Sequence, residues 1–174
     1  MVPGIDGSDA AHWQTRWEAE TLSTRIRPAS WSAPERDDWL DALEREARAG
    51  DLVVAHSLGC LAALDWLQGT RIPLAGALLV APPDRDGPAF PDAAASFRSP
   101  AGPVPVPALV IVSSDDPYCV PERQHELSAI WGAGLIDVGA RGHLNSRSGL
   151  GRWDEGYRIL AAFAAGLGSP LPWP

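Results

Sequence analysis

One serine of this chain has the surroundings of a catalytic nucleophile. Ser57 ends an apolar run, has the small residues Ala55 and Gly59 two positions away on either side, and is followed at once by a helical pattern. This arrangement matches a nucleophile elbow, G-x-S-x-G with alanine in the first glycine position, in which a sharp strand-to-helix turn exposes the hydroxyl. Bulky flanking side chains would collide in such a turn. The next backbone N–H, that of Leu58, would face a developing oxyanion at a helix N-terminus.

A serine hydroxyl is barely nucleophilic at neutral pH, so Ser57 needs a base and an orienting acid. The α/β-hydrolases carry these groups in the order serine, acid, histidine. Asp115 and Asp116 follow a second buried-strand pattern at 107–112, which would place them at the sheet edge where α/β proteins build their sites. The spacing does not decide between these two aspartates. Asp137 lies inside a further strand pattern and is expected to be structural.

Among the four histidines, His143 has the position expected of the base. It lies after both aspartates, in a glycine-bounded loop that follows the last predicted strand at 134–138. His56 precedes the serine and would point away from its face of the turn, so we interpret it as packing or local polar support. His12 lies in the early loop and helix region. His125 lies in a predicted helix, where a solvent-facing position is expected.

The elements that must position these residues alternate between strand and helix. Strands are expected at 52–55, 76–80, 108–112 and 134–138, with a remnant at 1–2 and a weak strand at 24–26. Helices are expected at 10–20, from Pro34 to a stop at Gly50, and at 57–68, 121–131 and 153–165. This alternation predicts an α/β fold. We expect a three-layer sandwich of the α/β-hydrolase type, with a central, mostly parallel sheet and helices on both faces. No room remains for a large cap domain.

The segment at 81–107 breaks this alternation because it is rich in proline, alanine and glycine. A helix is expected there only around 92–97. The segment replaces the usual crossover after the carboxyl end of a strand, so it should border the active site. Two interpretations are open for it: a lid or specificity loop, or an ordered surface connection.

Several segments along almost the whole chain form a joint pattern that is more specific than any one of them. They are Val2-Pro3-Gly4 with Ser8, His12-Trp13-Gln14 with Trp17-Glu18, Trp31 with Pro34 and Trp39, Ala55-His56-Ser57-Leu58-Gly59, Ser114-Asp115-Asp116-Pro117-Tyr118, and Gly142-His143-Leu144-Asn145. Together they resemble the small cap-less α/β-hydrolases related to the retinoblastoma-binding serine hydrolase. In that family the catalytic acid directly precedes a proline. The resemblance therefore implies Ser57 as the nucleophile, Asp116 as the acid and His143 as the base.

The chain departs from that family pattern in two places. Family members have a full apolar strand before the Pro-Gly pair, whereas here only Met1-Val2 precede it, so we expect a truncated first strand. A truncated strand would remove sheet pairing and the anchor of the first oxyanion loop. The Leu-x-Cys-x-Glu motif associated with retinoblastoma binding is also not met, because its nearest counterpart at 58–62 lacks the acid. Retinoblastoma-type binding is therefore not supported.

The expected chemistry is acyl transfer to water. His143 would take the proton of Ser57 as the hydroxyl attacks a carbonyl, Asp116 would hold the imidazole, and water would resolve the acyl-enzyme. Backbone N–H groups of Leu58 and Ile5 would bind the oxyanion.

Small acyl esters are the expected substrates, and thioesters and amides are open alternatives. His12 and Trp13 are candidates for the substrate pocket, since aromatic rings often line such pockets. Two other functions are kept as alternatives: a non-catalytic protein-binding module on a hydrolase fold, and an acyltransferase that uses the same triad. No metal and no organic cofactor are implied.

The composition limits the remaining possibilities. At 174 residues, of which 45% are hydrophobic and 21% charged, the chain is expected to form one domain over 1–174 with a substantial core. The net charge of −8 argues against nucleic acid as a partner. No apolar run is long enough to span a bilayer and no signal peptide is visible, so we expect a cytoplasmic location without a membrane partner. Cys60 and Cys119 lack a metal-binding spacing and are expected to be buried thiols.

Overall fold

The computed structural model describes residues 1–21 and 23–169, in which strands and helices alternate. The strands are β1 (Leu52–His56), β2 (Gly76–Val80), β3 (Ala108–Val112) and β4 (Gly134–Asp137), and the helices are α1 (Trp13–Thr21), α2 (Arg36–Glu46), α3 (Leu58–Leu67), α4 (Pro121–Ile130) and α5 (Asp154–Gly166). Within these described residues, no helix has the length and apolar character needed to cross a bilayer.

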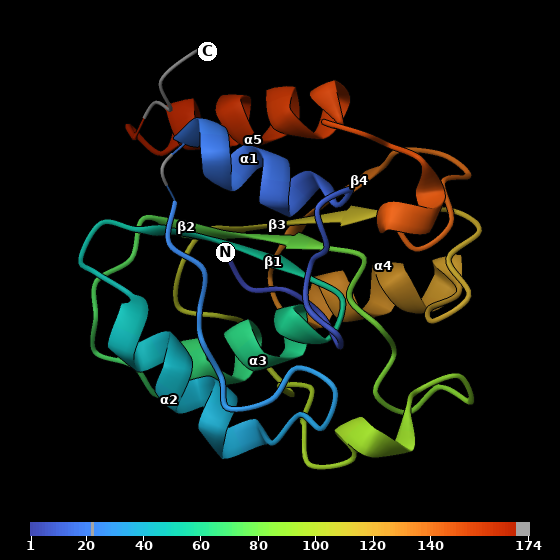
Figure 1. Cartoon of the computed structure of the whole chain (residues 1–174), viewed down its shortest axis with the longest axis horizontal. Helices are drawn as coiled ribbons and strands as arrows, with labels where there is room; N and C mark the ends of the chain where they lie inside the picture. Colours follow the sequence, from blue (N-terminus) through green and yellow to red (C-terminus); the bar gives the residue numbers. More distant parts are fainter. Residues whose placement is uncertain (22, 170–174) are drawn as a thin grey trace.

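The four strands form a parallel sheet in the order β1-β2-β3-β4. Figure 1 shows this sheet as the middle layer, with α1 and α5 on one face and α2, α3 and α4 on the other. The predicted three-layer α/β sandwich with a parallel sheet is thereby confirmed. Because all the strands run the same way, their carboxyl ends meet at one edge of the sheet, on the right in Figure 1. Functional groups of α/β proteins gather at this edge.

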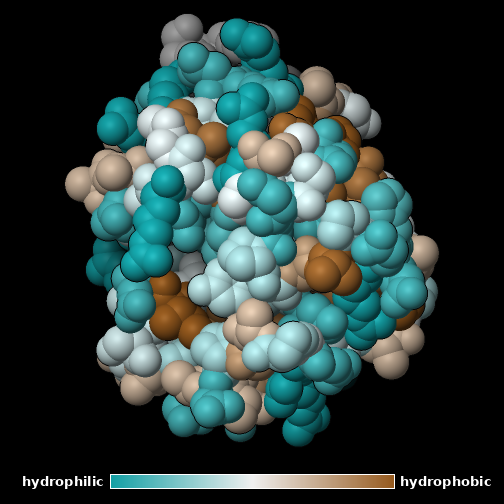
Figure 2. Space-filling model, turned by 90° about the vertical axis from the view of Figure 1, so that its right-hand side faces the viewer, coloured by the Kyte–Doolittle hydropathy of each residue, from teal (hydrophilic) through white to brown (hydrophobic). Residues whose placement is uncertain are grey.

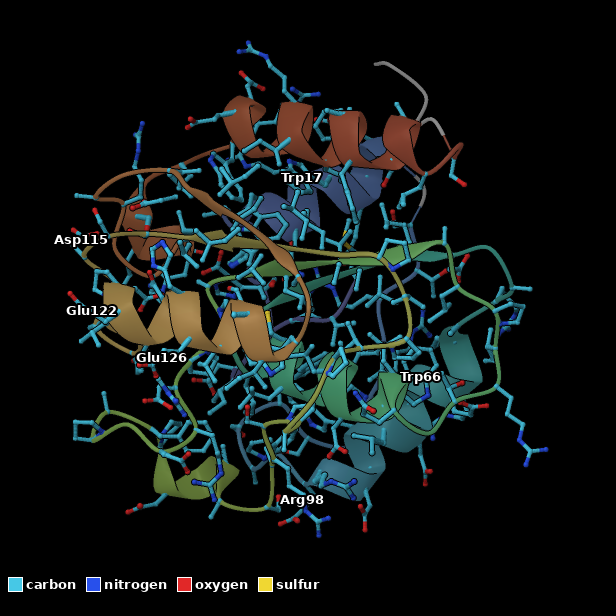
Figure 3. All side chains as sticks on the ribbon, turned by 180° about the vertical axis from the view of Figure 1, so that it is seen from behind. Trp17, Trp66, Arg98, Asp115, Glu122 and Glu126 are labelled. Atoms are coloured by element: carbon cyan, nitrogen blue, oxygen red, sulfur yellow. The ribbon has the colours of Figure 1, made fainter. Side chains whose placement is uncertain are left out.

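Each face of the sheet has its own core. On the face of α2, α3 and α4, the largest buried side chains are Trp39, Trp131 and Phe97, and leucines of α3 and β2 fill the space around them. On the other face, side chains of the sheet pack against α1 and α5, and Trp17 stacks on Trp153 with ring centroids 5.8 Å apart. Figure 3 shows Trp17 in this layer, between the sheet and the two helices. Trp17 of α1 and Trp153 at the start of α5 therefore join the two helices on this face.

The segment before the Pro-Gly pair forms a single parallel bridge, between Val2 and Ala55. The Val2 N–H donates to the carbonyl of Val54, and the His56 N–H donates to the carbonyl of Val2, both at 2.9 Å. The side-chain amide of Gln14 adds bonds to the Val2 and Val54 carbonyls at 3.3 Å. The loop that follows Val2 is therefore anchored on β1, contrary to the expectation that truncation would release it.

Several element predictions differ from the structure. The first helix, expected from residue 10, begins at Trp13, and the second, expected to stop at Gly50, ends at Glu46. The weak strand at 24–26 is not formed; Ile26 makes a bond to the Met1 carbonyl outside any strand. The second helix begins at Arg36 rather than at Pro34, because Glu35 has an extended backbone with φ −112° and ψ 128°. The N–H of Arg36 instead finds an acceptor in the Ser96 hydroxyl at 3.2 Å, a partner from a distant segment.

Candidate active site

Ser57 lies on a strained turn between β1 and α3. Its φ of 54° and ψ of −128° are unusual for a residue with a side chain and cost about 1–3 kcal/mol. The turn is held by the Ser57 N–H, which donates to the Val80 carbonyl at the end of β2 at 2.9 Å. Gly59, two positions after the serine, must be small, since a Cβ there would lie 2.3 Å from the carbonyl oxygen of Val2. This is the predicted elbow geometry.

The structure brings the side chains of Ser57, His143 and Asp116 together. Nδ1 of His143 lies 2.9 Å from both carboxylate oxygens of Asp116, and Nε2 lies 2.7 Å from the Ser57 hydroxyl. A carboxylate only accepts hydrogen bonds, so Nδ1 carries the proton in the neutral ring and Nε2 is left to accept from the serine. This is the arrangement in which an imidazole can remove the serine proton and a carboxylate can stabilise the imidazolium.

The two neighbouring aspartates that the sequence spacing left open have separate positions. The side chain of Asp116 is fully buried and also accepts from the Tyr118 N–H at 2.9 Å. Asp115 does not contact the imidazole; it accepts from the Ser113 hydroxyl at 2.8 Å and from the Gly142 N–H at 2.6 Å. These two bonds lower the pKa of Asp115 below its ordinary value. Figure 3 shows Asp115 where the strands end, near the start of α4.

The loop that carries His143 is held from its other side as well. The ring Nε2 of His56 lies 2.9 Å from the His143 carbonyl, and the indole N–H of Trp13 donates to the Leu144 carbonyl at 2.8 Å. Two successive carbonyls of the loop are thus fixed by buried side chains from β1 and α1. Leu144 itself has a positive φ of 50°, so these bonds also hold a strained backbone. His56 therefore gives the local polar support expected of it.

Two backbone N–H groups near the serine have the properties expected of an oxyanion hole. A Cβ on Gly4 would lie 2.8 Å from Cβ of Ser57, so only glycine lets this loop approach the nucleophile so closely. Ile5 follows Gly4, and Leu58 opens α3; both line the cavity at Ser57. Within residues 1–21 and 23–169, neither the Ile5 N–H nor the Leu58 N–H donates to a protein acceptor. Both donors are available to a ligand.

A cavity of about 450 Å³ opens at the serine. His12 lines it, as expected, whereas Trp13 is not among its lining residues, because the indole is 1% exposed and turned to Leu144. Trp13 is therefore a packing and loop-holding residue rather than part of the pocket. Figure 2 views this end of the molecule and shows hydrophobic residues scattered among hydrophilic ones, without one continuous apolar patch.

The proline-rich segment at 81–107 forms part of the cavity wall through Pro83, Ala89, Phe90 and Pro91. It is ordered by Arg85, whose guanidinium donates to the Phe97 carbonyl at 2.7 Å and lies 4.7 Å from the centre of the Phe90 ring. Its regular structure is a single 3-10 helix, Asp92–Ala94. The segment borders the site, as expected.

Several lining residues were not predicted as site residues. The Tyr118 ring lies 4.4 Å from the His143 ring, and Asn145, Ser146 and Arg147 continue the wall beyond the histidine. Tyr118 and Asn145 belong to the quoted loop motifs, so proximity in sequence to Asp116 and His143 was the available signal. Nothing in the sequence marked Arg147.

The described residues contain no group of three or more His, Cys, Asp or Glu side chains arranged to hold a metal ion. Cys60 and Cys119 are both unpaired and buried, as expected. Burial raises the pKa of each thiol, so neither is a nucleophile at neutral pH.

Known proteins are similar to this chain over most of its length. A family model described as serine hydrolase matches residues 1–162. A solved structure described as a YdeN-like hydrolase, from Pectobacterium atrosepticum, is 35% identical, with 98% of this chain and 90% of that chain covered and a TM-score of 0.85. The ydeN gene product of B. subtilis is 22% identical, with 94% of this chain and 96% of that chain covered and a TM-score of 0.77. No curated protein matches the chain.

The shared fold extends to more distant proteins. BpoC of Mycobacterium tuberculosis H37Rv, described as a non-heme bromoperoxidase, is 16% identical, with 95% of this chain and 91% of that chain covered and a TM-score of 0.67. At this level of identity the likeness concerns the α/β-hydrolase fold alone. The relation to the retinoblastoma-binding member stays a prediction.

Proposed function

Because the chain belongs to the serine hydrolase family, we propose that it hydrolyses small carboxylic esters through an acyl-enzyme formed on Ser57. One observation carries the proposal: His143 lies between the two other side chains, 2.7 Å from the Ser57 hydroxyl and 2.9 Å from the Asp116 carboxylate. A side-chain set of this kind activates a serine for attack on a carbonyl.

The proposed reaction has two halves. In the first, Ser57 Oγ attacks the ester carbonyl while His143 Nε2 takes its proton, and the Ile5 and Leu58 N–H groups stabilise the negative oxygen. The imidazolium then gives the proton to the leaving alcohol, and the acyl group remains on Ser57. In the second half, water loses a proton to His143 and attacks the acyl-enzyme, which releases the carboxylic acid and restores the serine.

The cavity supports a small acyl substrate. Its volume of about 450 Å³ is at the small end of ligand sites, and an apolar wall from 83–91 faces the reacting groups. Thioesters and amides could undergo the same chemistry and stay open as alternatives. We place esters before amides because an alkoxide leaves more easily than the anion of an amine. A cytoplasmic location and the absence of nucleic-acid and membrane partners stay predictions.

Labelling with a fluorophosphonate tests the proposal. We expect the wild type to be labelled and Ser57→Ala and His143→Ala to be unlabelled while all three keep the same far-UV circular dichroism. Folded wild type that is not labelled would overturn the triad assignment and favour the binding-module alternative. A panel of 4-nitrophenyl esters, repeated with added alcohols as competing acyl acceptors, then separates a hydrolase from an acyltransferase.

A further inference from the structure

His12 is a buried polar side chain whose ring has one unused nitrogen. The residue is 3% exposed and lines the cavity that contains Ser57. No acceptor among residues 1–21 and 23–169 lies within hydrogen-bond distance of its Nε2. A buried donor without a partner is costly, so its presence in a cavity calls for a ligand.

The other ring nitrogen fixes the proton on Nε2. The backbone N–H of Gln14 donates to Nδ1 of His12 at 3.2 Å. A backbone N–H can only donate, so Nδ1 is unprotonated and the neutral ring carries its proton on Nε2. Burial lowers the pKa of His12 to about 4, which keeps the ring neutral at physiological pH.

The neighbours of His12 do not supply an acceptor for this N–H. The nearby carboxylate of Asp9 accepts from the Ala11 and His12 N–H groups and from the Ser146 hydroxyl through Oδ1 alone, and neither of its oxygens lies within hydrogen-bond distance of the His12 Nε2. The His56 ring lies edge-on, 4.8 Å from the His12 ring, and its own Nε2 is used by the His143 carbonyl. Since no described residue supplies the acceptor and His12 lines the cavity at Ser57, we consider a ligand bound in that cavity as the source of the acceptor.

We propose that His12 determines acyl specificity by donating its Nε2–H to an oxygen atom of the substrate's acyl group. The site would then favour acyl groups that carry an ether, hydroxyl or carbonyl oxygen near the scissile carbonyl over plain alkyl groups. The donor is a neutral N–H group, so an uncharged ether, hydroxyl or carbonyl oxygen is a sufficient acceptor for it. This inference rests on the proposed ester hydrolysis at Ser57.

The test uses two esters of the same size. 4-Nitrophenyl methoxyacetate and 4-nitrophenyl butyrate have the same leaving group, and their acyl chains differ by an oxygen in place of a methylene. The measured quantity is the selectivity ratio, kcat/KM for methoxyacetate divided by kcat/KM for butyrate. Because each variant is compared with wild type on both esters, the intrinsic reactivity of the two esters cancels.

Two substitutions of His12 test the roles of its two ring nitrogens separately. His12→Asn keeps a side-chain acceptor for the Gln14 N–H but removes the Nε2–H, and we expect it to lower the selectivity ratio about tenfold or more. His12→Gln places an amide donor near the Nε2 position without the acceptor for Gln14, so it should retain a higher ratio than His12→Asn. His125→Asn, an exposed histidine on α4, is the matched control and should leave the ratio unchanged.

The outcomes separate this inference from the proposed function. A selective loss in His12→Asn with a wild-type ratio in His125→Asn would support the donor role. An unchanged ratio in folded His12→Asn would overturn it, whether or not both rates fall. No turnover of either ester by the wild type, together with no fluorophosphonate labelling, would overturn the proposed function and the inference with it.

Discussion

Acidification should destabilise the fold through His12. Burial lowers the pKa of this ring to about 4 in the folded protein, against an ordinary value of 6.5. Between these two values the unfolded chain binds a proton that the folded protein does not, so stability falls as the pH is lowered through this window. The difference of about 2.5 between the pKa values corresponds to about 3 kcal/mol lost on reaching pH 4.

Chemical denaturation of wild type and His12→Asn from pH 7 to pH 4 measures this loss. Asparagine does not titrate and still offers an acceptor to the Gln14 N–H, so it preserves the contact while removing the charge change. Subtracting the free energies of unfolding removes the contributions of other titrating groups, including His56, whose pKa is also lowered by burial. The wild-type value should fall by about 3 kcal/mol relative to the variant.

A difference that stays constant within about 0.5 kcal/mol over this range would refute the reasoning. It would mean that the folded protein protonates His12 as readily as the unfolded chain does. The ring would then not be a neutral donor held in an apolar setting, and the case for its Nε2–H as a substrate contact would fail as well.

Three further changes test other parts of the structure. Trp13→Phe removes the donor to the Leu144 carbonyl, so we expect kcat to fall about tenfold with the far-UV circular dichroism kept, and an unchanged kcat would contradict the positioning role. Gly59→Ala places a methyl group 2.3 Å from the Val2 carbonyl, so we expect a loss of about 2 kcal/mol or more in thermal unfolding, and a wild-type midpoint would show that the approach is not close. Cys60 is fully buried with a raised thiol pKa, so a maleimide should modify it in urea and not in buffer, as mass spectrometry would show; rapid modification in buffer would speak against burial.

Most of the sheet could be predicted from the sequence because parallel strands buried on both faces are continuous apolar runs. The predicted strand at 76–80 coincides with β2, in which every residue is buried. The elbow was predictable for a different reason: Gly59 is small where the turn has no space. Both signals are local, which is why a single sequence carries them.

The misplaced start of α2 shows where local signals fail. Proline suits the first turn of a helix, so Pro34 is a reasonable start by local rules. The helix instead begins two residues later, where the Ser96 hydroxyl from the cavity-side segment accepts from the Arg36 N–H. A contact between residues 60 positions apart has no signature in either neighbourhood.

The same limit applies to the site. The order of Ser57, Asp116 and His143 along the chain could be recognised from the sequence. The bond that Asp115 accepts from the Gly142 N–H could not, because only folding brings the two residues together. Trp13 and His12 are adjacent in sequence and look equally suited to a pocket. Only the direction of the chain at the start of α1 sends one ring to the cavity and the other to the Leu144 carbonyl.

The bond from Trp13 to Leu144 joins residues 131 positions apart, and the indole of Trp17 reaches the Arg152 carbonyl across 135 positions. The contacts at the serine turn come from the first half of the chain, from Val2 and Val80, whereas the loop that bears the base is held by bonds between the two ends of the chain. A chain in which these ends have not yet met therefore has a serine without its base, and that serine does not react with acyl compounds. In refolding, fluorophosphonate labelling should first appear with the slowest step, in which the two ends of the chain come together. The appearance of labelling would then report when that step is complete.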